Sequence, residues 1–214
     1  MSGKFITFEG GEGSGKSTQI KLLDEYLRRQ GVETLLTKEP GGTDIGLALR
    51  KILVEGDADK LDAKAEALLF FADRRIHMVQ KVWPAMEKNQ WVLSDRFADS
   101  TMAYQYYAYE KRLLKTDIQT LYQFSVGDFK PALTLILDID PQIGLARSYK
   151  KAAETNTREL RNEMRHLSWH QRLREGYLQI AKEEPERCVV LNADTSVEDL
   201  HTQIKQVIQE RFGV

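Results

Sequence analysis

The stretch FITFEGGEGSGKS, residues 5–17, decides the fold of this chain. Its first four residues are β-branched or aromatic, which favours a buried strand, and glycines follow. From Gly15 to Arg29 apolar residues recur at helical spacing, and Gly31 is expected to stop that helix. The octet at 10–17 fits G-x-x-x-x-G-K-[S/T], whose glycines let backbone N–H groups turn inward onto phosphate oxygens. The flanking strand and helix supply the context that this motif requires.

The octet therefore predicts a site for a nucleoside triphosphate, and a Gly-rich surface turn is the alternative. Lys16 is expected to reach the β- and γ-phosphates, and Ser17 offers a hydroxyl to Mg²⁺. Glu12 is unusual beside polyphosphate, and it is either a solvated acid or a residue that faces a second substrate. The loop residues expected to bind ATP are Gly10, Gly11, Glu12, Gly13, Ser14, Gly15, Lys16, Ser17 and Thr18.

Further apolar runs alternate with helical patterns along the chain. Strands are predicted at 34–37, 91–94, 133–137 and 189–191. Helices are predicted at 47–53, 63–86 with a bend before Pro84, 100–109, 116–126 and 197–212. This alternation predicts an α/β fold with a five-stranded parallel sheet covered by helices on both faces. We expect one domain over residues 1–214.

Composition excludes several classes of protein. The chain has 214 residues, 42% of them hydrophobic and 29% charged, with a formal net charge of −1. Nothing in this balance indicates a surface for nucleic acid or membranes. No window approaches the ~18 apolar residues that a membrane helix needs, and no signal-peptide pattern is seen, so we expect a cytoplasmic protein. The single cysteine, Cys188, lies in an apolar run and is interpreted as a core residue.

Two further features bear on chemistry. Asp95 closes the third strand, at the sheet edge where open α/β sheets bind ligands, so it could hold Mg²⁺ together with Ser17. The alternative is that Asp95 caps the next helix. Residues 147–174 are dense in charge with few apolar anchors, and we interpret them as a mobile excursion rather than part of a core.

Three segments go beyond the phosphate-binding loop. They read TKEPGGT at 37–43, FFADR at 70–74, and DRF at 95–97 followed by Ser100-Thr101 and Ala103-Tyr104-Gln105. In order and spacing they resemble the signatures of the thymidylate kinase family, over residues 4–212. The resemblance implies a three-layer P-loop nucleoside monophosphate kinase fold with a helical lid at about 147–165. It also implies Mg²⁺-dependent transfer of phosphate from ATP to dTMP, in a homodimer.

The resemblance also implies roles for individual residues. Phe70 would stack on thymine, although a core aromatic is the alternative from position alone. Arg74, one turn along the same helix face, would bind the base edge rather than form a surface salt bridge. Arg50 and Arg96 would clamp the dTMP phosphate, which suits the fork of arginine. The implied substrate-binding residues are Glu12, Glu39, Pro40, Arg50, Phe70, Arg74, Arg96, Ser100, Thr101, Tyr104 and Gln105.

The loop at 10–17 contains no arginine, and in bacterial-type members of the family the lid supplies a catalytic one. The candidate catalytic residues are therefore Lys16, Asp95 and Arg96 together with a basic residue of the lid. The lid candidates are Arg147, Lys150, Lys151 and Arg161. Ala193 falls where the family places its adenine-side loop. Three departures are visible: Lys38 replaces an arginine, Tyr106-Tyr107-Ala108-Tyr109 replaces a glycine-containing segment, and Leu160 stands where an acid is common.

Three other functions compete with this hypothesis. Another small P-loop kinase could act on a different nucleotide or nucleoside. A GTP-dependent switch would need an N-K-x-D segment, which the chain lacks. A non-catalytic ATP-binding module would not need paired arginines for a second anion. For a kinase of this type the acceptor is already an anion, so positioning and charge neutralisation are expected to suffice without a strong general base.

Overall fold

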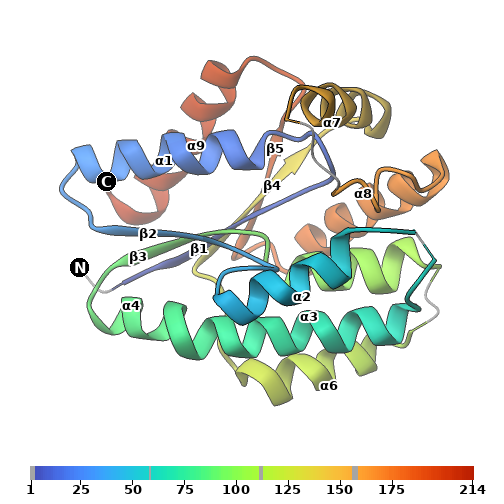
Figure 1. Ribbon diagram of the computed structural model, residues 1–214. Coiled ribbons are helices and arrows are strands. Elements are labelled where there is room, and N and C mark those ends of the chain that lie inside the picture. The colour runs from blue at the N-terminus through green and yellow to red at the C-terminus, as the bar shows by residue number, and fades with distance from the viewer. Residues whose placement is uncertain (1–2, 58, 111–112, 156–158) are drawn as a thin grey trace.

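The computed structural model describes residues 3–57, 59–110, 113–155 and 159–214. Within this part of the chain, parallel strands form one twisted sheet (Figure 1). Its members are β1 (Phe5–Glu9), β2 (Thr34–Lys38), β3 (Trp91–Asp95), β4 (Leu133–Asp138) and β5 (Cys188–Asn192). Their order across the sheet is β2-β3-β1-β4-β5. The predicted five-stranded parallel sheet is confirmed.

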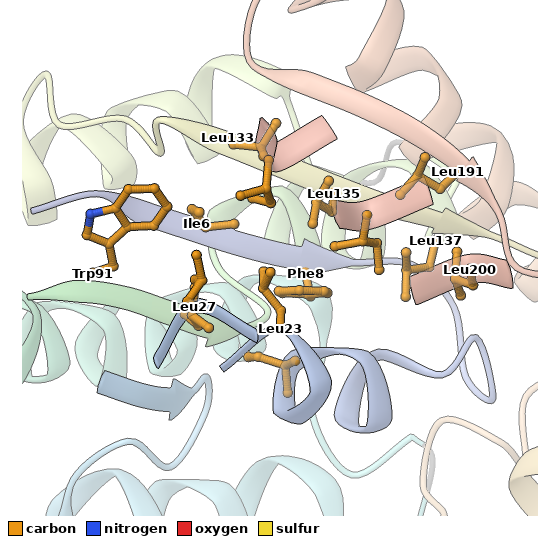
Figure 2. Close-up of a cluster of buried hydrophobic side chains, with 14 of the residues drawn as sticks. Ile6, Phe8, Leu23, Leu27, Trp91, Leu133, Leu135, Leu137, Leu191 and Leu200 are labelled. Atoms are coloured by element: carbon orange, nitrogen blue, oxygen red, sulfur yellow. The ribbon is translucent and has the colours of Figure 1, made fainter. Parts of the chain in front are cut away.

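Both faces of the central strands β1, β3 and β4 are buried, which explains why these strands read as continuous apolar runs. In β1, Ile6 and Phe8 point to one face, whereas Phe5 packs on the other. Ile6 lies level with Leu93 of β3 and Leu133 of β4, so neighbouring strands add to the same layer. Figure 2 shows this layer of aliphatic and aromatic side chains gathered around β1.

Helices cover the two faces as separate layers (Figure 1). On one face lie α1 (Lys16–Arg29) and α9 (Val197–Phe212), which contact each other. On the other lie α3 (Ala63–His77), α4 (Trp83–Glu87) and α6 (Lys115–Val126). The helix α1 ends as predicted, because Gly31 takes a left-handed φ of 79° just beyond it.

The long helix predicted at 63–86 is one helical run with an irregular middle. Between α3 and α4, residues Met78–Val82 form π-helical turns directly before Pro84. Proline has no N–H to donate to the preceding turn, so a local change of hydrogen-bond pattern is expected there. The helix predicted at 100–109 is similarly divided into α5 (Ala98–Thr101) and a π-helical segment, Met102–Ala108. The helix α2 (Asp44–Val54) starts before its predicted position because the Thr43 side chain caps it.

Residues 147–174 are interpreted from the sequence as an excursion that takes no part in a core. This interpretation is wrong for the second half of the segment, which contains Trp169 and Leu173 of a core cluster. Residues 147–155 belong to α7 (Pro141–Thr155) and residues 167–174 belong to α8 (Leu167–Glu183), and the periodicity of the sequence predicted neither helix. Trp169, Leu173 and Tyr177 of α8 are buried against β4 and the π-helical segment at 102–108. They recur every four residues among charged neighbours, so a narrow apolar stripe suffices to dock the helix. Cys188 is buried in the same cluster, as predicted.

Candidate active site

A cavity of about 540 Å³ opens at the carboxyl ends of β1 and β3. The phosphate-binding loop follows β1 and forms one wall of it. Gly13 has a φ of 67°, and a Cβ added there would come within 1.9 Å of the Gly144 carbonyl oxygen, so a side chain is excluded by both backbone conformation and space. The N-terminus of α1 points its N–H groups toward the same loop. This arrangement matches the expected phosphate cradle.

Lys16 is buried at the base of the cradle. Its Nζ donates to the carbonyl oxygens of Gly10 (3.0 Å) and Gly11 (2.7 Å) and to Ser14 Oγ (3.2 Å). Burial and the neighbouring Arg96 cation lower the pKa of Lys16 to about 8. The ammonium group therefore remains mostly charged at neutral pH and is held ready for an anion.

Ser17 and Asp95 line the same cavity. Among the described residues no three acidic, histidine or cysteine side chains gather in a way that could hold a metal by themselves. Mg²⁺ commonly uses one or two protein oxygens together with substrate phosphates and water, so this donor pair fits that ion. The alternative role of Asp95 as a helix cap is wrong, because Phe97 occupies the N-cap position of α5.

The turn after β3 places Arg96 in a left-handed conformation, with φ of 73°, which is uncommon for a side chain of this size. Glu9, fully buried at the end of β1, holds this turn. Its Oε1 accepts from the Phe97 N–H (2.7 Å), and its Oε2 accepts from the Ser100 hydroxyl (2.6 Å). Ser94 Oγ also donates to the Arg96 carbonyl (2.7 Å). Hydrogen bonds on both sides of the strained residue therefore fix it.

The Arg96 guanidinium lies between the phosphate-binding loop and the side chains of Ser100 and Tyr177. Its Nη1 donates to the Gly10 carbonyl (3.1 Å), to Ser100 Oγ (3.0 Å) and to Tyr177 (3.0 Å). Its Nη2 lies 3.4 Å from Glu12 Oε1, which also accepts from the Tyr104 hydroxyl at 2.5 Å. Burial opposes ionisation of Glu12, yet the Arg96 and Lys16 cations and the Tyr104 hydrogen bond lower its pKa below the usual value. Glu12 therefore faces the cavity interior as a carboxylate.

The far end of the cavity is lined by α3. Phe70 is half-buried, lines the cavity and is absent from the core clusters, whereas its neighbour Phe71 packs in one of them. Arg74 is fully buried, so the surface salt bridge considered for it is wrong. Its Nε donates to Glu39 Oε2 (2.9 Å) and its Nη2 to Thr101 Oγ1 (3.1 Å). The predicted base-binding residues thus meet on one wall.

Arg50 has a partner that the sequence did not suggest. Its Nε and Nη2 donate to the two carboxylate oxygens of Glu159, at 2.8 and 2.6 Å, while Nη1 donates to the Pro40 carbonyl (2.9 Å). Hydrogen bonding to Arg50 lowers the pKa of Glu159. A carboxylate held by both arms of a guanidinium fork has the geometry that a phosphate would have there.

The predicted lid residues lie in different surroundings. Lys151 Nζ is 3.1 Å from Ser17 Oγ, beside the cradle, and Arg147 Nη1 donates to the Ala193 carbonyl at 2.9 Å. Arg161 is buried and donates to Glu66 Oε1 at 2.5 Å. Lys150 does not line the cavity. Ala193 is itself buried in the core beneath α9, so it offers its backbone rather than its side chain.

Several residues of the site were not predicted. Glu9, Glu66, His77, Glu159 and Tyr177 each bind a residue of the predicted set. All but Glu159 are buried. Their partners lie 38 residues or more away along the chain, so no local pattern marks them. The one available signal was that Glu9 and His77 are polar residues within apolar stretches.

A parallel sheet with a glycine-rich, lysine-bearing loop and several arginines lining the same cavity fits the class of P-loop phosphotransferases. Comparison with known proteins narrows this class. The thymidylate kinase family profile matches residues 8–204, and the chain belongs to that family. It is 44% identical to the thymidylate kinase of Magnetococcus marinus over 214 residues, which span 100% of this chain and 99% of the relative. It is 45% identical to that of Afipia carboxidovorans over 211 residues, covering 99% and 91% of the two chains.

A solved structure supports the same assignment. The crystal structure of thymidylate kinase from Ehrlichia chaffeensis superposes with a TM-score of 0.77 at 34% sequence identity, over 98% of this chain and 99% of the other. The predicted P-loop kinase fold and family are therefore confirmed.

The buried carboxyl of Glu9 yields a pH-dependent prediction. Burial and the nearby Asp99 raise its pKa from 4.5 to about 7, so the folded protein binds more protons there than the unfolded chain does between these pH values. The contribution of Glu9 to the free energy of unfolding should therefore fall as pH rises from about 4.5 to about 7. Glu9→Gln lacks this proton site. Urea unfolding at several pH values should show the wild type losing stability relative to Glu9→Gln across that window. A constant difference would contradict the assignment.

Proposed function

We propose that this protein transfers the γ-phosphoryl group of ATP to dTMP, yielding ADP and dTDP. The single observation that carries the proposal is that one cavity is lined both by residues suited to bind a triphosphate and by residues suited to bind a phosphate acceptor. Lys16 and Ser17 lie on its triphosphate side, whereas Arg50, Phe70 and Arg74 lie on its acceptor side. Arg96 sits between the two sides, bonded to the cradle carbonyl of Gly10.

Thymine recognition follows from two polar atoms left without partners. Among the described residues, Arg74 Nη1 and Gln105 Oε1 are buried and have no hydrogen-bond partner, and both residues line the cavity. Thymine offers a carbonyl acceptor at O4 and a donor at N3–H, which complement this donor and this acceptor. Phe70 stacks on the ring, Thr101 and Gln105 border it, and Tyr104, bonded to Glu12, closes the space around the sugar.

The reaction needs two anions to approach each other. Lys16 binds the β- and γ-phosphates, and Arg96 and Arg50 hold the dTMP phosphate in line. The attacking oxygen of dTMP is already anionic, so Asp95 and Glu12 are not needed as strong bases. Because these cations are largely withdrawn from water, they stabilise the charge of the transferring group more than exposed cations would.

Mg²⁺ is proposed as the metal of the reaction. Ser17 Oγ would bind it directly and Asp95 directly or through water, as the cavity lining allows. When bound, the ion supplies neutralisation of charge on the β- and γ-phosphates. The protein residues do the remaining work of orienting ATP and excluding water.

The described parts of the segment 147–165, residues 147–155 and 159–165, are proposed to act as the lid of a single kinase domain, and residues 156–158 lie outside the described residues. Lys151 and Arg147 approach the triphosphate side, since Lys151 already contacts Ser17. They would supply positive charge in addition to that of Lys16, because the phosphate loop contains no arginine. On the acceptor side, the dTMP phosphate exchanges with the Glu159 carboxylate on the Arg50 fork. Arg161 keeps its contact with Glu66 and anchors the lid rather than touching phosphate.

We further propose a homodimer that works in the cytoplasm. Large apolar side chains are exposed on the outer helices: Leu68 on α3 is 57% exposed and Phe124 on α6 is 90% exposed. An adjacent copy of the chain would cover them. No helix of the described residues is long and apolar enough to cross a membrane. The near-zero net charge gives no support for nucleic acid as a partner.

Removal of the cradle lysine tests the reaction itself. With Mg²⁺, ATP and dTMP, the purified protein should produce dTDP, and Lys16→Ala should lower turnover by about a hundredfold or more, on the order of 3 kcal/mol of transition-state stabilisation. The measurement is a coupled assay of ADP release with chromatography of the products. A variant that keeps near wild-type turnover, or a wild type that makes no dTDP, refutes the proposal.

Phe70→Ala tests the acceptor side. Loss of the stacking ring should raise the KM for dTMP by about tenfold or more while leaving the KM for ATP within about twofold. Steady-state kinetics with each substrate varied in turn will measure both constants. Phe70→Tyr keeps the ring and serves as the matched control, with the KM for dTMP near the wild-type value. Equal changes in both KM values would instead indicate a general packing role.

A further inference from the structure

His77 is a fully buried histidine at the end of α3 that belongs to none of the sequence motifs of the site. Its Nδ1 lies 2.7 Å from Glu39 Oε1, and its Nε2 lies 2.6 Å from Thr37 Oγ1. It therefore joins the end of β2 and the following substrate loop to the helix that carries Phe70 and Arg74. A fully buried polar side chain lowers the stability of the fold unless its polar atoms are hydrogen-bonded, and both ring nitrogens of His77 have a partner.

The direction of these hydrogen bonds follows from the chemistry of the groups. The Glu39 carboxylate can only accept, so the imidazole donates from Nδ1. In the neutral ring, Nε2 is then the acceptor and the Thr37 hydroxyl is its donor. The other oxygen of Glu39, Oε2, accepts from Arg74 Nε at 2.9 Å. Thr37, His77, Glu39 and Arg74 thus form one chain, which we call the positioning chain.

The positioning chain determines which nitrogen of Arg74 faces the ligand. Glu39 occupies Nε and Thr101 occupies Nη2, so the planar guanidinium has no freedom left to rotate. The ring centroids of Phe71 and Phe97 lie 4.6 and 5.0 Å from its central carbon, so both rings pack against the guanidinium. Nη1 is the nitrogen without a partner among the described residues, and it is a donor only.

We propose that His77 is a specificity-determining positioning residue, which acts through Glu39 to fix Arg74 Nη1 as a donor toward the O4 carbonyl of the pyrimidine. This inference rests on the proposed function, which places thymine against Arg74. Cytosine presents an amino group in place of O4, and that group is also a donor. A fixed donor therefore favours thymine over cytosine, whereas a mobile guanidinium could turn away from the amino group.

A purely structural role for His77 is the alternative. Its ring packs tightly on the substrate loop, because a Cβ added to Gly42 would come within 2.4 Å of His77 Cδ2. If packing were the whole role, substitution would lower stability without changing the choice between bases. The two roles therefore differ in a measurable ratio.

The test is the ratio of the dissociation constants of dCMP and dTMP, measured by titration calorimetry, together with the KM values for dTMP and ATP. His77→Leu should lower this ratio by about tenfold, raise the KM for dTMP by a similar factor, and change the KM for ATP by less than about twofold. His77→Asn should restore most of the discrimination, because its amide nitrogen can replace Nδ1 as the donor to Glu39. Thr37→Val should show a smaller loss of the same kind.

Two controls separate the possible failures. Val82→Ala, in the same helical run but in a core cluster without Glu39 or Arg74, should lower thermal stability and leave the ratio unchanged. Arg74→Gln should lose at least as much discrimination as His77→Leu. If Arg74→Gln loses discrimination and His77→Leu keeps it, the role of His77 is overturned and the proposed function stands. If Arg74→Gln also keeps it, the placement of thymine is wrong, and the inference fails with it.

Discussion

Three cationic side chains of the cavity, Lys16, Arg50 and Arg74, are each held against an acceptor that the chain itself supplies. Lys16 donates to the carbonyl oxygens of its own loop, Arg74 to Glu39 and Arg50 to Glu159. An unpaired charge withdrawn from water costs several kcal/mol, so a site that must bind two anions can be assembled only if its cations are compensated beforehand. The fold around the cavity is arranged to meet this constraint.

These compensating pairs fall into two groups with different consequences for binding. Arg74 and Glu39 are both almost fully buried, and their pairing fixes a nitrogen rather than blocking it. Glu159 lies on the lid segment and is 38% exposed, so water can receive it when a phosphate takes its place on Arg50. In the proposed function the buried Arg74–Glu39 pair orients the ligand, whereas the half-exposed Arg50–Glu159 pair exchanges its carboxylate for a phosphate. The strained Arg96 turn, fixed by Glu9, joins the two sides.

The sequence predicts those parts of the fold and site whose determinants are contiguous. The octet at 10–17 contains its glycines, its lysine and its hydroxyl side by side, so the cradle could be placed with its flanking strand and helix. The apolar runs of the strands predict a sheet buried on both faces. By contrast, α8 was missed because its buried face mixes the apolar residues Trp169, Leu173 and Tyr177 with His170 and Gly176, among charged neighbours.

The supporting contacts of the site could not be predicted, because they depend on which distant side chains the fold brings together. Glu9 and Ser100 are 91 residues apart, and Arg50 and Glu159 are 109 apart. In each case the family resemblance indicated one member of the pair, whereas its partner is an ordinary glutamate in sequence. Arg161, one of the predicted lid candidates, lines the cavity, and the sequence did not reveal that it also pairs with the buried carboxylate of Glu66.

The central claim is that thymine and its phosphate are received by one row of residues facing the cradle. A crystal structure with dTMP, Mg²⁺ and a non-hydrolysable ATP analogue tests it most directly. The account predicts thymine stacked on Phe70 with O4 at Arg74 Nη1, the Arg74–Glu39 pair intact, and the dTMP phosphate on Arg50 in place of Glu159. Thymine bound elsewhere, with Arg50 still paired to Glu159, would contradict it.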